Sequence, residues 1–86
     1  MSFGWVTQRW TAYDGDRCVA YNLWAADKDK YAVNFVWIVG KGIYGSIRYE
    51  DSNGEDKHLP GEMFEGMSLH KIKKYMETIA RMEGHE

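Results

Sequence analysis

The chain has 86 residues, of which 44% are hydrophobic and 15% are aromatic, and its formal net charge at pH 7 is −2. This length fits one domain with one core, and the apolar content argues against disorder. The charge gives no global field that would attract a polyanion, and no apolar run approaches the ~20 residues of a membrane span.

A meander of four strands is predicted in the first part of the chain. Residues 3–50 alternate between apolar and polar positions and are rich in β-branched and aromatic side chains. Turn residues interrupt this pattern at three places, which are residues 14–15, 27–30 and 40–42. We therefore expect strands over residues 5–12, 17–26, 31–39 and 42–50.

The first turn predicts which side chains of the first two strands share a face. A two-residue turn at Asp14-Gly15 would pair Tyr13 with Asp16. One side, the expected core side, then carries Val6, Gln8, Trp10, Ala12, Val19, Tyr21 and Leu23. The other side carries Trp5, Thr7, Arg9, Thr11, Cys18, Ala20, Asn22 and Trp24. We thus expect Trp10 to be buried under the helix, with Trp5 and Trp24 together on the opposite face.

The next hairpin is predicted to contribute a second apolar face. A three-residue turn at 40–42 pairs Val39 with Ile43 and sets Gly45 opposite Trp37, where it leaves room for the indole. The face then carries Val33, Phe35, Trp37, Val39, Ile43, Ile47 and Tyr49. An odd loop length around residues 27–30 joins this face to the first apolar set and an even length does not; we take the odd length.

The remainder of the chain predicts a loop and one helix. Residues 51–67 are polar and rich in turn signals, which indicates a loop, with a short fifth strand as the alternative. Ser68 fits a helix N-cap and Gly84 a C-terminal stop. The apolar stripe between them consists of Leu69, Ile72, Met76 and Ile79, and the solvated side carries Lys71, Lys74, Glu77 and Arg81. The sequence thus predicts an α+β domain over residues 1–86: an antiparallel four- to five-stranded β-meander followed by one C-terminal α-helix packed on one face.

Residue spacing argues against an enzyme, a metal site or a cofactor. The three histidines, His58, His70 and His85, lack the spacing of metal ligands. The acidic loop at residues 51–56 resembles a calcium loop, but Tyr49 and Pro60 stand where its first and last carboxylates would be. We therefore expect a non-enzymatic binding module.

The cysteine content and the N-terminus predict a cytoplasmic location. Cys18 is the single cysteine, so it cannot form an internal disulfide, and on a predicted strand it fits an inert thiol. The N-terminal residues lack the basic and apolar regions of a secretory signal.

The sheet face away from the helix is the candidate binding surface. On the expected register it displays Trp5, Trp24 and Tyr44 beside Arg9 and Arg48. Aromatic rings beside cations can stack on unpaired bases, and the same residue types are favoured at protein interfaces. Simple cross-strand packing of Trp5 on Trp24 is a third explanation.

Five short motifs stand in order between Tyr31 and Ile79. They are Gly40-Lys41 at a hairpin, Ile47-Arg48-Tyr49 on a strand, Gly54-Glu55 in a turn, Pro60-Gly61, and Gly66-Met67-Ser68-Leu69 before the helix. Through them this region resembles the single-stranded-DNA-binding domain of the transcriptional coactivator positive cofactor four. The resemblance implies a curved antiparallel sheet, a homodimer, and unpaired DNA held along the strands. It also implies cationic contacts from Lys41, Arg48 and Lys57, whereas residues 62–65 and the extra N-terminal hairpin depart from the family.

Two functional hypotheses follow. In the first, by resemblance, the domain binds single-stranded nucleic acid through Trp5, Arg9, Trp24, Lys41, Tyr44 and Arg48. In the alternative, the same face binds a protein, as in an inhibitor or accessory factor of the phage or mobile-element type. A homodimer is expected in addition, because both sheet faces carry more apolar area than one helix covers.

Overall fold

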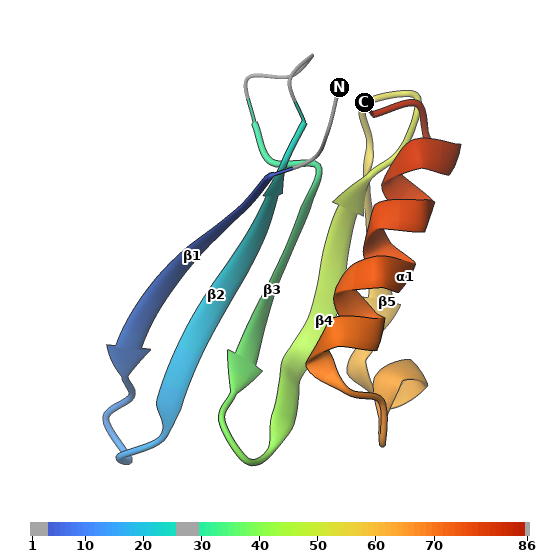
Figure 1. Cartoon of the computed structure of the whole chain (residues 1–86). Coiled ribbons are helices and arrows are strands. Elements are labelled where there is room, and N and C mark those ends of the chain that lie inside the picture. The colour runs from blue at the N-terminus through green and yellow to red at the C-terminus, as the bar shows by residue number, and fades with distance from the viewer. Residues whose placement is uncertain (1–3, 26–29, 86) are drawn as a thin grey trace.

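The computed structural model describes residues 4–25 and 30–85. Five antiparallel strands follow one another in chain order across one sheet, and a single helix comes after the last strand (Figure 1). The elements are β1 (Gly4–Thr11), β2 (Arg17–Trp24), β3 (Val33–Ile38), β4 (Gly42–Glu50), β5 (Asp56–Pro60), the 3-10 turn η1 (Gly61–Phe64) and α1 (Leu69–Met82). The predicted α+β class and the meander with its C-terminal helix are confirmed, and the fifth strand is formed.

The register of the first hairpin differs from the prediction. Ala12 and Asp16 close the turn, with the Ala12 N–H donating to the Asp16 carbonyl at 2.7 Å, so the loop has three residues instead of two. Gly15 adopts a positive φ of 93°, as the last residue of a three-residue hairpin loop commonly does. The extra residue shifts β1 by one position, which sends each of its side chains to the other face.

The exchange of faces corrects the expected positions of two tryptophans. Trp5 pairs with Leu23 and packs against the core beneath α1, whereas Trp10 pairs with Cys18 on the opposite face and is 44% exposed. The prediction that Trp10 is buried and Trp5 lies beside Trp24 was therefore wrong. The assignments for β2 were right, because Val19, Tyr21 and Leu23 are all core residues.

The assumption of an odd loop between β2 and β3 is confirmed by the strand pairing. Tyr21 pairs with Phe35 and Leu23 with Val33, so both apolar sets lie on one face. The expected end of the second strand at Ala26 and most of the turn at residues 27–30 lie outside the described residues.

The β3–β4 hairpin keeps its predicted core face with an altered register. Its loop is residues 39–41, and Trp37 pairs with Ile43, so the expected pairs of Val39 with Ile43 and of Trp37 with Gly45 were wrong. A register shift between Asn34 and Val36 accommodates extra β4 residues around Gly45, whose φ is 76°. Because the shift is even, the other residues of the predicted face keep their orientation. Val39 does not join the core as predicted, because it lies in the loop and is 53% exposed.

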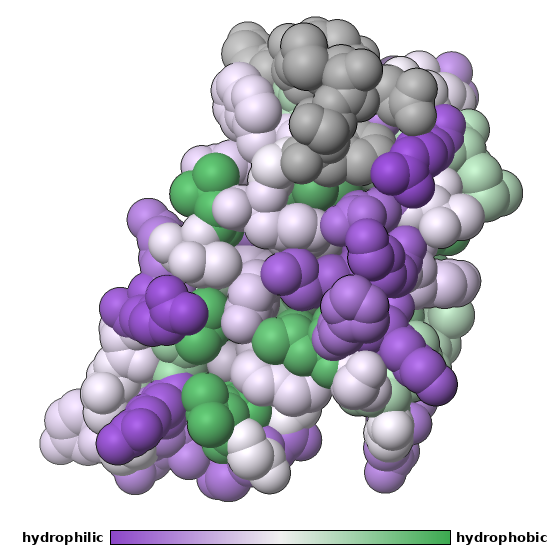
Figure 2. Space-filling view, viewed as in Figure 1, coloured by the Kyte–Doolittle hydropathy of each residue, from purple (hydrophilic) through white to green (hydrophobic). Residues whose placement is uncertain are grey.

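The helix covers one face of the sheet. Ser68 caps it by accepting a hydrogen bond from the Lys71 N–H at 3.2 Å, and Ile72, Met76 and Ala80 are buried against the sheet. Figure 1 shows α1 in front of β5 and next to β4, with β1 and β2 at the far side of the sheet in this view. The same view in Figure 2 shows hydrophilic groups gathered over α1 and apolar groups scattered over the rest of this face. Of the residues predicted on the solvated side of the helix, Glu77 is part-buried, because it accepts a hydrogen bond from Trp5.

The chain after the helix returns to the end of the sheet. His85 is buried, and its Nε2 lies 2.8 Å from the Glu50 carbonyl at the end of β4. A carbonyl accepts, so Nε2 carries the proton, while Nδ1 has no hydrogen-bond partner within the part of the chain that the structure describes. No helix among residues 4–25 and 30–85 has the length and apolar character to cross a membrane.

Candidate functional site

The sheet face opposite α1, here called the open face, is divided into a polar row and an apolar half. The polar row crosses the middle of the sheet, where Asn22 pairs with Asn34 and Asn34 with Arg48. The Asn22 amide donates to the Val6 carbonyl and accepts from the Asn34 amide, at 3.3 and 3.4 Å. These bonds satisfy polar groups that no helix covers.

The apolar half lies toward the β1–β2 and β3–β4 turns. Two cross-strand rows build it, which are Gln8–Ala20–Val36–Tyr44 and Trp10–Cys18–Ile38–Gly42. Small and β-branched side chains in the middle of these rows leave the rings at either side standing above them. The face is therefore concave at this end.

The concavity is an aromatic hollow of about 440 Å³. Cys18, Val36 and Ile38 line its floor, and three aromatic side chains, Trp10, Tyr13 and Tyr44, stand around it. Tyr44 is 69% exposed and Tyr13 is fully exposed. An exposed apolar site of this kind in a small protein usually marks a contact surface.

One end of the hollow carries acidic side chains. Asp14 and Asp16 line it, and the Asp16 N–H donates to Asp14 Oδ1 at 3.1 Å. Lys41 reaches across from the β3–β4 turn to place its Nζ 3.1 Å from Asp16 Oδ2. This hydrogen bond raises the pKa of Lys41 above its usual value of 10.5. Two carboxylates against one ammonium leave this rim negative.

The other end of the open face is held by ion pairs around Arg48. Its guanidinium donates to Asp56 Oδ1 at 2.8 Å and to the Tyr31 carbonyl at 2.6 Å. The bond from Arg48 lowers the pKa of Asp56 below its usual 3.8. Lys30 lies 2.7 Å from the buried Glu50 carboxylate, and this contact raises the pKa of Lys30. Trp24 stands at this end, in edge-to-face contact with Tyr31.

The six predicted site residues do not form one cluster. Trp24, Tyr44 and Arg48 lie on the open face, while Lys41 lies in a turn at its edge. Trp5 and Arg9 lie on the side of α1, because the first hairpin has the longer loop. The structure thus separates both of them from the surface to which they were assigned.

Trp5 has a structural environment on the helix side. Its Nε1 donates to Glu77 Oε2 at 2.8 Å, and the ammonium of Lys73 lies 5.4 Å from the ring centroid. Arg9 is exposed on the same side of β1 and reaches the Thr7 hydroxyl at 3.5 Å. The predicted Trp5–Trp24 contact is therefore absent.

Sequence reasoning missed Trp10 and Tyr13 as members of the open-face surface. Trp10 was assigned to the core, and Tyr13 was paired with Asp16 beside a two-residue turn. Tyr13-Asp14-Gly15 also fits a three-residue loop that ends in a left-handed glycine, and that alternative would have placed both rings correctly.

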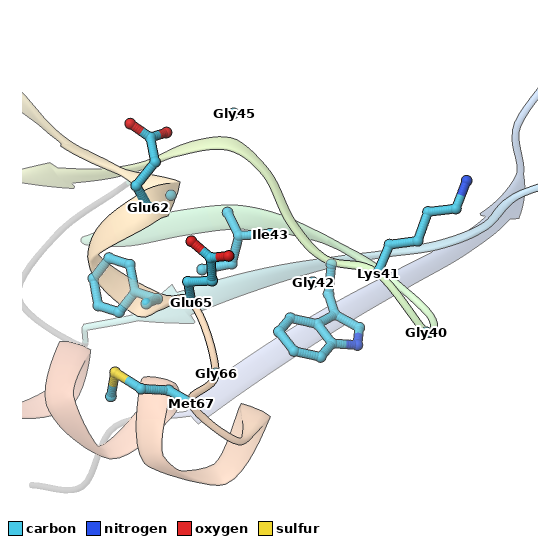
Figure 3. A pocket seen from close by; sticks show the side chains of 12 residues that line it. Gly40, Lys41, Gly42, Ile43, Gly45, Glu62, Glu65, Gly66 and Met67 are labelled. Carbon is cyan, nitrogen blue, oxygen red and sulfur yellow. The ribbon is translucent and has the colours of Figure 1, made fainter.

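A second pocket, of about 520 Å³, lies on the helix side between the β3–β4 turn and η1. Glycines line much of it, and Trp37, Ile43 and Met67 supply apolar walls. Figure 3 shows the Glu65 side chain turned toward the middle of this pocket and the Lys41 side chain extending away from it. Lys41 therefore serves the Asp16 contact and does not place a cation in this pocket.

The described ranges hold no candidate metal-binding cluster. Groups of three or more His, Cys, Asp or Glu side chains able to hold a metal ion are absent there. The acidic loop forms a turn, in which Asp51 Oδ1 accepts from the N–H groups of Asn53 and Glu55 at 2.9 Å each. Both hydrogen bonds lower the pKa of the Asp51 carboxyl, and the one from the Glu55 N–H has the larger effect.

Comparisons of the chain with known protein families, with curated proteins and with solved structures each found no match.

Proposed function

We propose that this domain is a non-enzymatic protein-binding module whose contact surface is the aromatic hollow on the open face. The observation that carries the proposal is the ring of Trp10, Tyr13 and Tyr44 around an uncovered apolar floor. Tryptophan and tyrosine are enriched among interface residues that dominate binding energy, because their rings bury much area at low entropic cost.

The charge at the rim indicates the chemistry of the partner segment. Asp14 and Asp16 stand at one end of the hollow, and Lys41 offsets one of these two charges. A segment with an apolar or aromatic anchor for the hollow and a neighbouring Lys or Arg for the rim is complementary to this surface. Such a segment is the ligand class that we propose.

Single-stranded nucleic acid is the second candidate. The resemblance to the coactivator domain and the exposed rings favour it, since any base can stack on an exposed aromatic side chain. Three cations that the resemblance assigns to phosphate contacts already have carboxylate partners. Lys41 contacts Asp16, Arg48 contacts Asp56, and Lys57 lies 3.8 Å from Asp51. A phosphate would have to compete with these pairs, so we rank this ligand second.

The proposed role is that of an inhibitor or accessory factor of the phage or mobile-element type. Small size and a single uncovered recognition face suit a protein that acts by occupying a partner. We further propose a two-fold homodimer and a cytoplasmic location.

Selection from a displayed library of random peptides tests the proposed function. We expect wild-type protein to enrich peptides with an aromatic or aliphatic anchor beside a basic residue. Trp10→Ala and Tyr44→Ala should each weaken a selected peptide by about tenfold or more, measured by fluorescence anisotropy. Met82→Ala removes a 74% exposed apolar side chain from α1 and should leave affinity unchanged. Equal losses in all three variants would contradict the assignment of the hollow.

A titration with single-stranded oligothymidylate separates the two ligand classes. Tryptophan emission is recorded at two salt concentrations in the wild type and in Tyr44→Ala. Binding that falls steeply with salt and weakens in the variant would place nucleic acid first. Unchanged emission at low salt would remove that candidate.

A further inference from the structure

The edge strand β1 has few of the features that protect sheet edges, since its single charged residue is Arg9. It lies at one end of the strand order, runs for 8 residues in unbroken register with β2, and is exposed at every residue except Trp5. Natural edges are commonly short, bulged, or marked by lysine or proline. The opposite edge, β5, has 5 residues and contains Lys57 and Pro60. The two edges therefore differ in their ability to accept another strand.

The hydrogen bonds of the first hairpin determine which backbone groups of β1 face outward. Ala12 is hydrogen-bonded to Asp16, and bonded and non-bonded pairs alternate along an antiparallel ladder. The even-numbered residues of β1 consequently bond to β2. The odd-numbered residues, Trp5, Thr7, Arg9 and Thr11, direct their N–H and C=O groups away from the sheet. This edge presents a regular row of donors and acceptors.

We infer that β1 pairs antiparallel with β1 of a second copy of this chain, about a two-fold axis that passes beside Gln8. The two five-stranded sheets then join into one of ten strands. This inference rests on the proposed homodimer and does not depend on whether the open face binds protein or nucleic acid, although Trp10 belongs to both surfaces. It names the surface through which the two copies meet.

Two criteria select the register of the β1–β1 pairing, which are the sheet face that each side chain occupies and the position of the charged Arg9. A two-fold axis normal to the sheet keeps both helices on one side, so paired residues must belong to the same face and the axis must pass beside a residue. An axis beside Gln8 sets Val6 opposite the partner's Trp10, and these side chains are 43% and 44% exposed in one copy. It also sets Arg9 opposite the partner's Thr7.

The neighbouring registers are less favourable. An axis beside Thr7 would set Trp10 opposite the partner's Gly4 and Val6 opposite the partner's Gln8, so the two apolar side chains would not meet. An axis beside Arg9 would bring two guanidinium groups directly opposite each other, which is destabilising. An axis beside Gln8 forms the Val6–Trp10 contact twice, once on each side of the axis, and keeps the two Arg9 side chains apart.

Disulfide trapping tests the register. In a Cys18→Ala background, Gln8→Cys places two thiols at a non-hydrogen-bonded pair, where Cα atoms lie about 4.5 Å apart and a disulfide is possible. We expect mild oxidation to give a covalent dimer with Gln8→Cys, but not with Thr7→Cys or Arg9→Cys. Efficient trapping through residue 7 or 9 instead would overturn the proposed register.

A matched pair of variants tests the use of this edge. Thr7→Pro removes an outward N–H without removing a bond to β2, and Thr7→Ala keeps that N–H. By light scattering, wild type and Thr7→Ala should have a mass of about 20 kDa, twice the 10.0 kDa of the chain, and Thr7→Pro should be monomeric with an unchanged circular dichroism spectrum. A dimeric Thr7→Pro would show that the dimer uses another surface, and a monomeric wild type would overturn the homodimer itself. If Thr7→Pro does not fold, the trapping experiment decides.

Discussion

The indole of Trp5 donates a 2.8 Å hydrogen bond to the carboxylate of Glu77, which joins the first strand of the sheet to the C-terminal helix. The ring also makes edge-to-face contacts with Tyr21 and Phe35, at centroid distances of 6.4 and 6.0 Å. A residue near the start of the chain thus helps to fix the helix over the core. Its role is in stability, in contrast to the binding role that the sequence predicted for it.

Replacing Trp5 with Phe should therefore destabilise the domain. The variant leaves the part-buried Glu77 carboxylate without this donor, which should cost about 1–3 kcal/mol. Urea denaturation followed by circular dichroism measures the change. The same substitution at Trp10, on the open face of the same strand, should alter stability by no more than about 0.5 kcal/mol. Equal effects at the two positions would contradict the register of β1.

A close approach at Gly61 gives a second prediction. A Cβ at this residue would lie 2.6 Å from the Gly45 carbonyl oxygen, so β4 and the start of η1 would have to separate. We expect Gly61→Ala to lower the free energy of unfolding by about 1–3 kcal/mol. Gly4→Ala is the matched control, because nothing lies within 4 Å of its Cβ. A neutral Gly61→Ala would mean that these two segments do not meet as described.

Stability should fall at acid pH because two carboxyl groups have lowered pKa values. Hydrogen bonds from Arg48 to Asp56, and from Glu55 to Asp51, keep both groups ionised below the usual 3.8. Their contribution is present above the unfolded-state pKa and is lost as the pH falls through the lower folded-state values. Urea midpoints measured from pH 6 to pH 2 should decline mainly below about pH 4. Asp56→Asn should be less stable at neutral pH and show a shallower decline, and an unchanged slope would contradict the assignment.

The buried His85 should stabilise the end of the helix. His85→Ala removes the 2.8 Å hydrogen bond to the Glu50 carbonyl and leaves space where a buried ring had been. A loss of about 1–3 kcal/mol is expected. Hydrogen exchange at the last turn of α1 should increase in the same variant. His58→Ala, at an exposed position on β5, should have neither effect.

The residues that the sequence placed correctly are those with an unambiguous apolar pattern. Val33, Phe35 and Tyr49 share the core face as expected, and Ser68 caps the predicted helix. The placement failed at β1, where Trp5 and Trp10 differ by an odd number of residues, so either can be the core ring. Only the length of the 13–15 loop distinguishes the two arrangements, and a single Asp-Gly pair is compatible with both lengths.

The candidate site was predictable only in part, for a related reason. Tyr44 and Trp24 belong to strands in which the apolar pattern shows which residues face the core, and both were assigned to the correct face. Arg48 was also assigned correctly, but its contacts with Asp56 and the Tyr31 carbonyl join segments that are separate in the chain. Periodicity does not reveal such contacts.

The length of the loop at residues 13–15 determines which side chains of β1 lie on the open face. Removing one residue from it would turn β1 over, replacing Val6 and Trp10 on the open face with a strand surface that bears Thr7 and Arg9. No strand residue would have to change. In this fold the deletion of one loop residue would therefore change more side chains on the open face than any single substitution. It would also move Trp5 away from Glu77. Variation in the length of this loop among related chains should consequently track differences in what they bind.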